Sequence, residues 1–418
     1  MTKSIVLLTL ISVILFMSRG ITGPINSLYV ASLGASYVVI GVLGTVTSLA
    51  TILFSYAWGR ASDALGRRKV FLTLGLLVIA ACNGLTALAR HYGVLFPLNF
   101  ISAVAQAAYL TGSLALMGDL LERSSRARGR KMGVYRGLAS LGFGVMAYFS
   151  GSVADSLSLN ATFGIAVVLL GVAFVLALNV DEAEGSIGAG QGIGDNQGIG
   201  TSQSAGGTSS QPSRDTSPQV VSVETETPVA SLPLSPLLVA AFLWSLVTGA
   251  VYAVWANYMV SELGYSQAQM SRLWALASLS EFPLMVVAGH FSDRLGRLPM
   301  LSLGFLAWAL VFLGYVVLPG MPGILAVQLL RGFAYSAFTA TAMTYAAEVR
   351  VRAQRGHASG LYNSAGGVGA ILGASLGGAL AQFAGFRLMI LSQAALIFAG
   401  AVYLAIVALR HRKSIWLQ

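Results

Sequence analysis

The sequence predicts an all-α polytopic membrane protein, whose twelve transmembrane helices form two pseudo-symmetric six-helix halves. Of its 418 residues, 56% are hydrophobic and 10% are charged, whereas soluble domains carry about 25% charged residues. Apolar stretches of about 20 residues recur along the chain, and each is long enough to cross a hydrocarbon core of about 30 Å as a helix. A polar motif also occurs twice, as Gly59–Lys69 and Gly289–Arg297, each time between two apolar stretches.

The predicted spans divide the chain into an N-terminal half, residues 1–180, and a C-terminal half, residues 234–418. The segment between them, residues 181–233, is rich in Gly, Ser, Thr and Gln and has no apolar periodicity. Such a segment cannot bury a core, so a disordered linker is predicted. The first apolar run is too long for a signal-peptide core and is interpreted as a retained span. The spans are expected at roughly 4–31, 36–57, 70–90, 94–117, 131–153, 160–180, 235–260, 266–288, 299–318, 322–346, 357–383 and 386–409.

The two halves match beyond the polar motif. Acidic residues end the fourth and tenth spans, an Arg-Gly pair opens the fifth and eleventh, and a Gly-x-Tyr pattern follows each pair. Landmarks kept in register along 180 residues indicate an internal duplication of six spans. The matching positions are Asp119 with Glu348, Arg128-Gly129 with Arg355-Gly356, and Gly133-x-Tyr135 with Gly360-x-Tyr362.

The distribution of Lys and Arg predicts the orientation. Basic residues gather at one set of loops and ends, as at Arg67, Arg68 and Lys69, and are sparse at the opposite set. Since cytoplasmic loops carry the excess of Lys and Arg, both termini and the linker are predicted to be cytoplasmic, with the cell membrane as the expected location. The net charge of +10 then reflects topology and gives no support for nucleic-acid binding.

No chemistry of an enzyme is recognisable in the sequence. The single cysteine, Cys82, lies within an apolar run, and the four histidines have no metal-ligand spacing. No phosphate-binding loop or catalytic triad is present, so neither an enzymatic activity nor a cofactor or metal is predicted.

The doubled Gly-x-x-x-Asp-x-x-Gly-Arg motif, the two six-span halves and the linker between them resemble the major facilitator superfamily. The resemblance covers the whole chain except Asp181–Pro233. It implies a secondary transporter that moves a small solute by alternating access, works as a monomer in the bilayer and can couple to protons. The pattern is closest to the efflux-type branch, but Ser102 stands where that branch carries an Arg in span four. Span five reads Gly142-Phe143-Gly144 and lacks the branch's Gly-Pro motif.

The resemblance assigns the motif loops to gating. Gly59 and Gly66 would allow close helix approach and a sharp turn, while Asp63 would accept hydrogen bonds at a helix N-terminus. Arg67 can pair with a carboxylate, for which Asp119 is the candidate. The predicted gating set is Gly59, Asp63, Gly66, Arg67, Asp119, Arg128, Gly289, Asp293, Gly296, Arg297, Glu348 and Arg355.

The same resemblance implies that spans one, four, seven and ten line the substrate pathway. These spans contain polar and aromatic residues suited to binding a solute. An arginine at mid-span costs about 2.5–3.5 kcal/mol, so buried arginines are expected to face a cavity. The predicted pathway residues are Arg19, Asn26, Asn99, Gln106, Tyr252, Trp255, Asn257, Gln328, Arg331 and Tyr335.

Glu281 is the only acidic residue inside a predicted span. Low-dielectric surroundings favour the neutral form of a carboxyl group, so Glu281 is the proton-coupling candidate, with Arg136 as its predicted partner. The alternative is a permanent ion pair of Glu281 with Arg136 or Arg331.

Spans five and eleven carry glycines at helical spacing, most regularly at Gly369, Gly373 and Gly377. Such stripes allow close packing of transmembrane helices, either in a fixed contact or in one that slides.

Solute export is the leading functional interpretation. The alternatives are import by a symporter or uniporter of the same fold, and a receptor or scaffold that transports nothing. The substrate itself, an amphipathic or sugar-like compound by first expectation, is not specified by any motif.

The composition of the linker leads to a first prediction. Deleting Gly190–Ser210 should leave transport close to that of the intact chain, because a flexible tether matters only when it becomes too short to join the halves. Transport in cells, normalised to the amount of inserted protein, measures this. A loss of transport with normal insertion would indicate a binding function within the linker.

Overall fold

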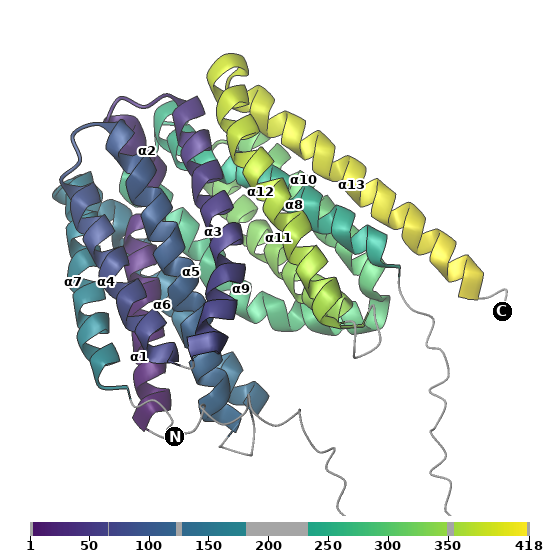
Figure 1. Ribbon diagram of the computed structural model, residues 1–418. Coiled ribbons are helices and arrows are strands. Elements are labelled where there is room, and N and C mark those ends of the chain that lie inside the picture. The colour runs from purple at the N-terminus through teal and green to yellow at the C-terminus, as the bar shows by residue number, and fades with distance from the viewer. Residues whose placement is uncertain (1–2, 66, 123–127, 181–232, 349–354, 416–418) are drawn as a thin grey trace, which may run out of the picture. The chain divides into compact units, whose positions relative to one another are not determined.

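The computed structural model describes residues 3–65, 67–122, 128–180, 233–348 and 355–415. These residues form helices and contain no strand (Figure 1). The helices of the first half are α1 (Lys3–Thr22), α2 (Asn26–Ser32), α3 (Tyr37–Leu65), α4 (Arg68–Ala87), η1 (Tyr92–Val94), α5 (Leu95–Glu122), α6 (Arg128–Ser156) and α7 (Leu159–Leu178). Those of the second half are α8 (Leu234–Asn257), η2 (Tyr258–Glu262), α9 (Gln267–Leu295), α10 (Arg297–Val317), α11 (Met321–Glu348), α12 (Arg355–Ala384) and α13 (Phe386–Ile415).

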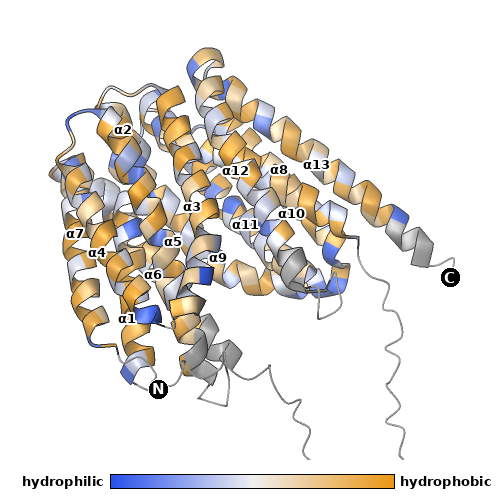
Figure 2. Ribbon diagram, in the orientation of Figure 1, coloured by the Kyte–Doolittle hydropathy of each residue, from blue (hydrophilic) through white to orange (hydrophobic). Residues whose placement is uncertain are grey.

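The prediction of an all-α membrane protein is confirmed. Twelve of the described helices are at least 20 residues long, one for each predicted span. Eleven of them are long and apolar enough to cross a membrane, and apolar residues dominate most of these helices in Figure 2. The twelfth, α11, is 28 residues long and carries the polar side chains of Gln328 and Arg331. The division into two halves and a linker stays a prediction, since nearly all of residues 181–233 lie outside the described residues.

The first span is interrupted, although the sequence predicted one helix over 4–31. Helix α1 ends at Thr22 and α2 begins at Asn26. Pro24 lies between them, and its missing N–H and fixed φ disfavour a continuous helix. The Gly23 amide still donates to the Arg19 carbonyl oxygen at 2.8 Å, which completes the last turn of α1. The polar residues Asn26 and Ser27 open α2, toward the end of the predicted span.

The glycine stripe of α12 makes a close contact with α8. A Cβ atom at Gly369, Gly373 or Gly377 would overlap backbone atoms of Phe242, Leu246 and Ala250 in turn. The two helices therefore pack backbone against backbone over three turns, as small residues permit in membranes. Both helices belong to the second half.

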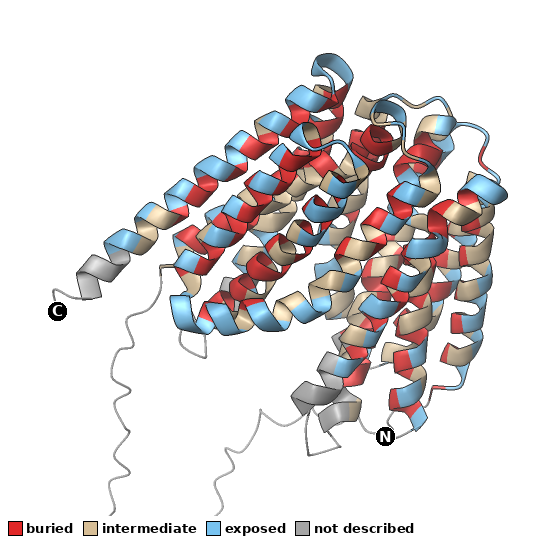
Figure 3. Ribbon diagram, turned by 180° about the vertical axis from the view of Figure 1, so that it is seen from behind, coloured by how far each residue is buried: buried red, intermediate tan, exposed pale blue. Residues whose placement is uncertain are grey.

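The halves meet most extensively through two helix pairs, α3 with α12 and α6 with α9 (Figure 1), and less extensively where α8 meets α2 and α3. In the first pair, the Tyr37 amide donates to Gln382 Oε1 at 3.0 Å, and Thr45 Oγ1 donates to the Ile371 carbonyl at 2.7 Å. Figure 3 shows buried and exposed residues alternating along the helices in general.

The α6–α9 pair is held at the start of α9, and we call this contact the seal: Gly151 and Asp155 of α6 against Gln267, Ala268 and Ser271 of α9. A Cβ atom at Gly151 would overlap the Gln267 carbonyl. The Gly151 amide donates to Ser271 Oγ at 3.0 Å, and the Ala268 amide donates to Asp155 Oδ2 at 2.9 Å. A carboxylate is favoured at this position because the helix N-terminus carries partial positive charge and free N–H groups.

The polar motifs lie toward the opposite ends of these helices, where no hydrogen bond between described residues joins the halves. Among the described residues, the hydrogen bonds between the halves lie on the seal side of α3, α6, α9 and α12, and one more joins Asn257 of α8 to Ser27 of α2. A Cβ atom at Gly59 or at Gly289 would meet no described atom within 4 Å. The close helix approach at Gly59 stays a prediction, because several residues around the first motif lie outside the described ones. Gly296, the counterpart of Gly66 in the second motif, has a φ of +91°, which favours glycine at the turn between α9 and α10. The turn predicted at Gly66 lies outside the described residues.

The seal leads to a second prediction. Gly151→Ala should separate the start of α9 from α6, because the added methyl overlaps a backbone carbonyl that cannot rotate away. Ser27, which lines a cavity between the halves, serves as the reporter, as Ser27→Cys in a background where the buried Cys82 is replaced by Ala. A membrane-impermeant maleimide added on the seal side should label this cysteine several-fold faster in the Gly151→Ala variant.

Gly164→Ala is the matched control, because a Cβ atom at Gly164 would meet nothing within 4 Å. Equal labelling rates in the Gly151→Ala and Gly164→Ala proteins would contradict the role of the seal.

Candidate functional site

A cavity of about 370 Å³ lies between the two halves, and we call it the polar cavity. The break after α1 and the middle of α3 supply hydroxyl and amide groups, and α5 adds Asn99. The C-terminal half closes the cavity with α8 and α9. Its polar lining residues are Asn26, Ser27, Thr47, Ser48 and Asn99, and its aromatic ones are Tyr252 and Trp274.

A second cavity of about 350 Å³ lies within the C-terminal half, and we call it the aromatic cavity. Helices α8, α9, α10, α11 and α12 contribute to it. Arg331 of α11 is the one charged residue among its lining residues. The others are Trp244, Ser245, Thr248, Gly249, Tyr252, Trp274, Trp308, Tyr335 and Ala370.

Tyr252 and Trp274 line both cavities. Their rings meet edge to face, with centroids 5.6 Å apart, which is a favourable geometry for aromatic pairs. The Arg331 guanidinium carbon lies 4.6 Å from the Tyr252 ring centroid and 4.8 Å from that of Trp274. One cation therefore faces both rings of the partition between the cavities.

Glu281 lies on α9, close enough to Arg331 for the two charges to act on each other. No ion pair joins these two described side chains, so their nitrogen and oxygen atoms are more than 4.0 Å apart. The side chain of Arg136, the predicted partner of Glu281, lies outside the described residues. Glu281 and Arg331 therefore form no ion pair in this conformation.

Three predicted pathway residues are buried in packing. Trp255 is fully buried, with its ring 5.3 Å from that of Trp274. Gln328 is fully buried and accepts a hydrogen bond from the Tyr315 hydroxyl at 3.1 Å, and that hydroxyl lies 3.3 Å from the Tyr252 hydroxyl. Asn257 is 1% exposed and donates to the Ser27 carbonyl at 3.4 Å. Trp255 and Asn257 contact residues that line the cavities directly, and Gln328 does so through Tyr315.

Arg19 and Gln106 are not among the lining residues of either cavity. The Arg19 guanidinium carbon lies 5.6 Å from the Phe16 ring centroid, one turn earlier on α1. Their assignment to the substrate pathway stays a prediction. Asn26, Asn99, Tyr252, Arg331 and Tyr335 do line the cavities, as their assignment requires.

The sequence did not indicate several lining residues. Thr47 and Ser48 come from the second span, Trp274 from the eighth and Trp308 from the ninth, whereas the family resemblance pointed to spans one, four, seven and ten. Trp274 and Trp308 could have been singled out in the sequence as candidates, since the chain contains only six tryptophans. Their convergence on one cavity required the helix packing.

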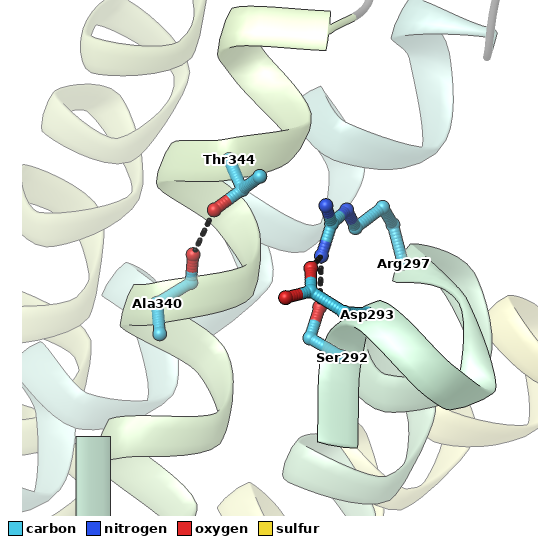
Figure 4. A network of polar contacts seen from close by, with 5 residues as sticks. All are labelled: Ser292, Asp293, Arg297, Ala340 and Thr344. Carbon is cyan, nitrogen blue, oxygen red and sulfur yellow. Dashed lines mark hydrogen bonds and ion pairs between the residues drawn. The ribbon is translucent and has the colours of Figure 1, made fainter. Parts of the chain in front are cut away.

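The gating residues are described in part. Arg297 Nη1 lies 2.6 Å from Asp293 Oδ1 and donates to Ser292 Oγ at 2.9 Å, so the motif of the second half ties the end of α9 to the start of α10 (Figure 4). In the first half, Arg67 precedes α4. Outside the described residues or side chains lie Asp63, Gly66, Asp119, Arg128, Glu348 and Arg355.

Comparison with known proteins identifies a family whose model matches this chain. The model of the MFS_1 like family matches residues 8–391. A protein of Deinococcus radiodurans, named as a candidate sugar efflux transporter, is 25% identical over 405 residues, covering 94% of this chain and 95% of that protein. Citrate exporter 1 of Aspergillus niger is 30% identical over 121 residues, or 29% of this chain and 22% of the exporter.

Among solved structures, a mutant of the nucleoside transporter NupG superposes with a TM-score of 0.79 at 14% identity. The match covers 97% of this chain and all of that one. At this identity the similarity concerns the fold alone.

The ion pair in the second motif leads to a third prediction. Asp293→Asn should change the melting temperature little, because the Asp293 side chain is 69% exposed and exposed ion pairs contribute about 0–1 kcal/mol. Solute flux should nevertheless fall strongly if Asp293 and Arg297 hold a gate. Arg294→Gln, a change of exposed charge in the same turn, is the control. Undiminished flux in the Asp293→Asn protein would exclude a gating role for this pair.

Proposed function

The chain belongs to the MFS_1 like family and is a membrane transporter rather than an enzyme, and on this premise we propose that it exports a small polar solute by alternating access. The two cavities at the partition of Tyr252 and Trp274 carry this proposal. Together they offer hydroxyl, amide and aromatic groups of the kind that bind small solutes.

The contacts between the halves support alternating access. The seal and the α3–α12 hydrogen bonds join the halves at one end. At the other end, near the two polar motifs, no hydrogen bond between described residues joins them. In the orientation predicted from Lys and Arg, this conformation is open to the cytoplasm. Rocking of the halves about the polar cavity would break the seal and bring the motif loops together, exposing the solute on the other side.

Export is proposed because of the relatives' names. The full-length relative is named for sugar efflux and the partial one for citrate export. A hydroxyl-rich solute also suits the polar cavity, whose side chains donate and accept hydrogen bonds without a formal charge. Import by a symporter or uniporter and a role as receptor or scaffold remain the alternatives, and transport in reconstituted protein separates them.

The proposed function is tested in proteoliposomes that contain the purified protein. Preloaded radiolabelled glucose should exchange with external glucose, and empty liposomes should show no exchange. A compound library screened by thermal stabilisation would widen the set of solutes. Failure of every stabilising solute to exchange would favour a receptor over a transporter.

Export is distinguished from import by direction. In membrane vesicles turned inside out, an exporter should accumulate the solute when a proton gradient is imposed, whereas an importer should do so in right-side-out vesicles. Accumulation confined to right-side-out vesicles would overturn export.

We further propose that Glu281 carries the coupled proton, which gives a fourth prediction. In an alternating cycle its carboxyl group would exchange between protonation and the neighbouring charge of Arg331. Glu281→Gln should therefore abolish accumulation driven by a proton gradient and preserve exchange of solute without a gradient. Glu262→Gln, which removes an exposed acid near the seal end, is the control. Normal gradient-driven accumulation by Glu281→Gln would end this proposal.

A structural ion pair is the rival role of Glu281. Breaking a buried pair from one side costs about 3–5 kcal/mol, so Glu281→Gln would then lower the melting temperature. Adding Arg136→Gln would recover much of the loss. Melting curves for the single and double variants decide between the two roles.

A further inference from the structure

Arg331 is a buried cation with an open hydrogen-bonding position. Its side chain lies on α11 and the residue is only 7% exposed. Its Nη1 atom is buried and makes no hydrogen bond within the described part of the chain. A buried guanidinium that lacks an acceptor is costly, and here it lies in the wall of the aromatic cavity.

The neighbours of Arg331 stabilise its charge without satisfying its N–H groups. The Tyr252 and Trp274 rings lie 4.6 and 4.8 Å from the guanidinium carbon, and aromatic faces attract a cation in this range. A ring face is at best a weak acceptor, so the N–H donors stay available for an oxygen ligand. Glu281 is the nearby acid, and it does not reach ion-pair distance of Arg331.

We propose that the aromatic cavity is a subsite for an acidic group of the transported solute, a carboxylate or a phosphate monoester. The guanidinium presents a planar fork of donors, which matches the paired oxygens of both groups. This inference rests on the proposed function and narrows its substrate class to small acids.

The polar cavity provides for the rest of such a solute. It meets the aromatic cavity at Tyr252 and Trp274, and its own polar groups are the hydroxyls and amides of residues such as Asn26, Thr47 and Asn99. These groups hydrogen-bond a neutral, hydroxyl-bearing body. The preferred solute is therefore a hydroxyl-rich acid, with its anionic group against Arg331.

The carboxylate of Glu281 interacts with the same guanidinium. When it is charged, it would repel an acidic ligand bound to Arg331. Replacing it by Gln removes a competing negative charge next to the subsite. Glu281→Gln should thus bind an acid more tightly than the unmodified protein does, whereas loss of Arg331 should bind it more weakly. Opposite effects from two neighbouring residues are not expected of a general loss of folding.

Calorimetric binding to the purified full-length protein at fixed ionic strength tests the subsite. The probes are glucose, glucuronate and glucose 6-phosphate, which share a sugar body and differ in the acidic group. Both acids, or one of them, should bind about ten-fold or more tightly than glucose. The stronger of the two identifies carboxylate or phosphate as the preferred group.

Arg331→Gln should weaken binding of the preferred acid by about 10-fold to 100-fold and leave glucose binding within about two-fold. Arg331→Lys keeps the charge without the planar fork and should fall between the two, which also provides a measurement if the Gln variant does not fold. Arg90→Gln, an exposed arginine outside both cavities, should change nothing.

Three results would overturn the subsite. They are equal binding of glucose and both acids, no binding of either acid, and an unchanged preference for the acid in the Arg331 variants. Exchange in proteoliposomes separates this inference from the proposed function. Glucose exchange without any acid preference leaves the transporter standing and removes the subsite. Acid-selective binding without any exchange would support the acid-binding subsite and remove the transport function.

Discussion

The contact of α6 with α9, backbone against backbone at Gly151 and Gln267, is the constraint that joins the two halves at one end of the space that holds the polar cavity. Ser271 accepts the Gly151 amide hydrogen bond, and Trp274 follows on the same helix, about one turn further along. The seal therefore lies about one helical turn from the ring that both cavities share. Asp155 of α6 accepts a hydrogen bond from the Ala268 amide at the N-terminus of α9. Its negative charge is favoured by the partial positive charge of that helix end only while the two helices are in contact.

The membrane makes the placement of charge the second constraint. A cation at mid-span is tolerated where rings, neighbouring charge or a cavity offset its loss of water. Arg331 has all three, with Tyr252 and Trp274 against its guanidinium, Glu281 on α9 nearby, and the aromatic cavity before it. The break at Pro24 acts similarly for the backbone, since irregular segments at this depth are stable where they face protein or a water-filled space. Both departures from regular apolar helices lie at cavity walls.

Sequence patterns predicted the elements well and their contacts unevenly. The stripe at Gly369, Gly373 and Gly377 packs closely, as its spacing indicates, because glycine removes the atoms that would hold two backbones apart. Gly59 has the same chemistry and no near neighbour among the described atoms. A glycine permits a close approach, but the relative position of the halves decides whether one occurs, and the proposed alternating cycle would change that position.

By itself the sequence determined the helical membrane fold, its twelve spans, the duplication and the motif that relates the chain to its family. These follow from hydropathy, helix length and spacing, which are local or periodic along the chain. Only the tertiary structure decided that Trp274 and Trp308 line a cavity, that Trp255 and Gln328 stand behind its wall, and that Arg331 is the cation beside Glu281. Each of these facts depends on the rotation of one helix against another, which is fixed by packing between residues far apart in sequence.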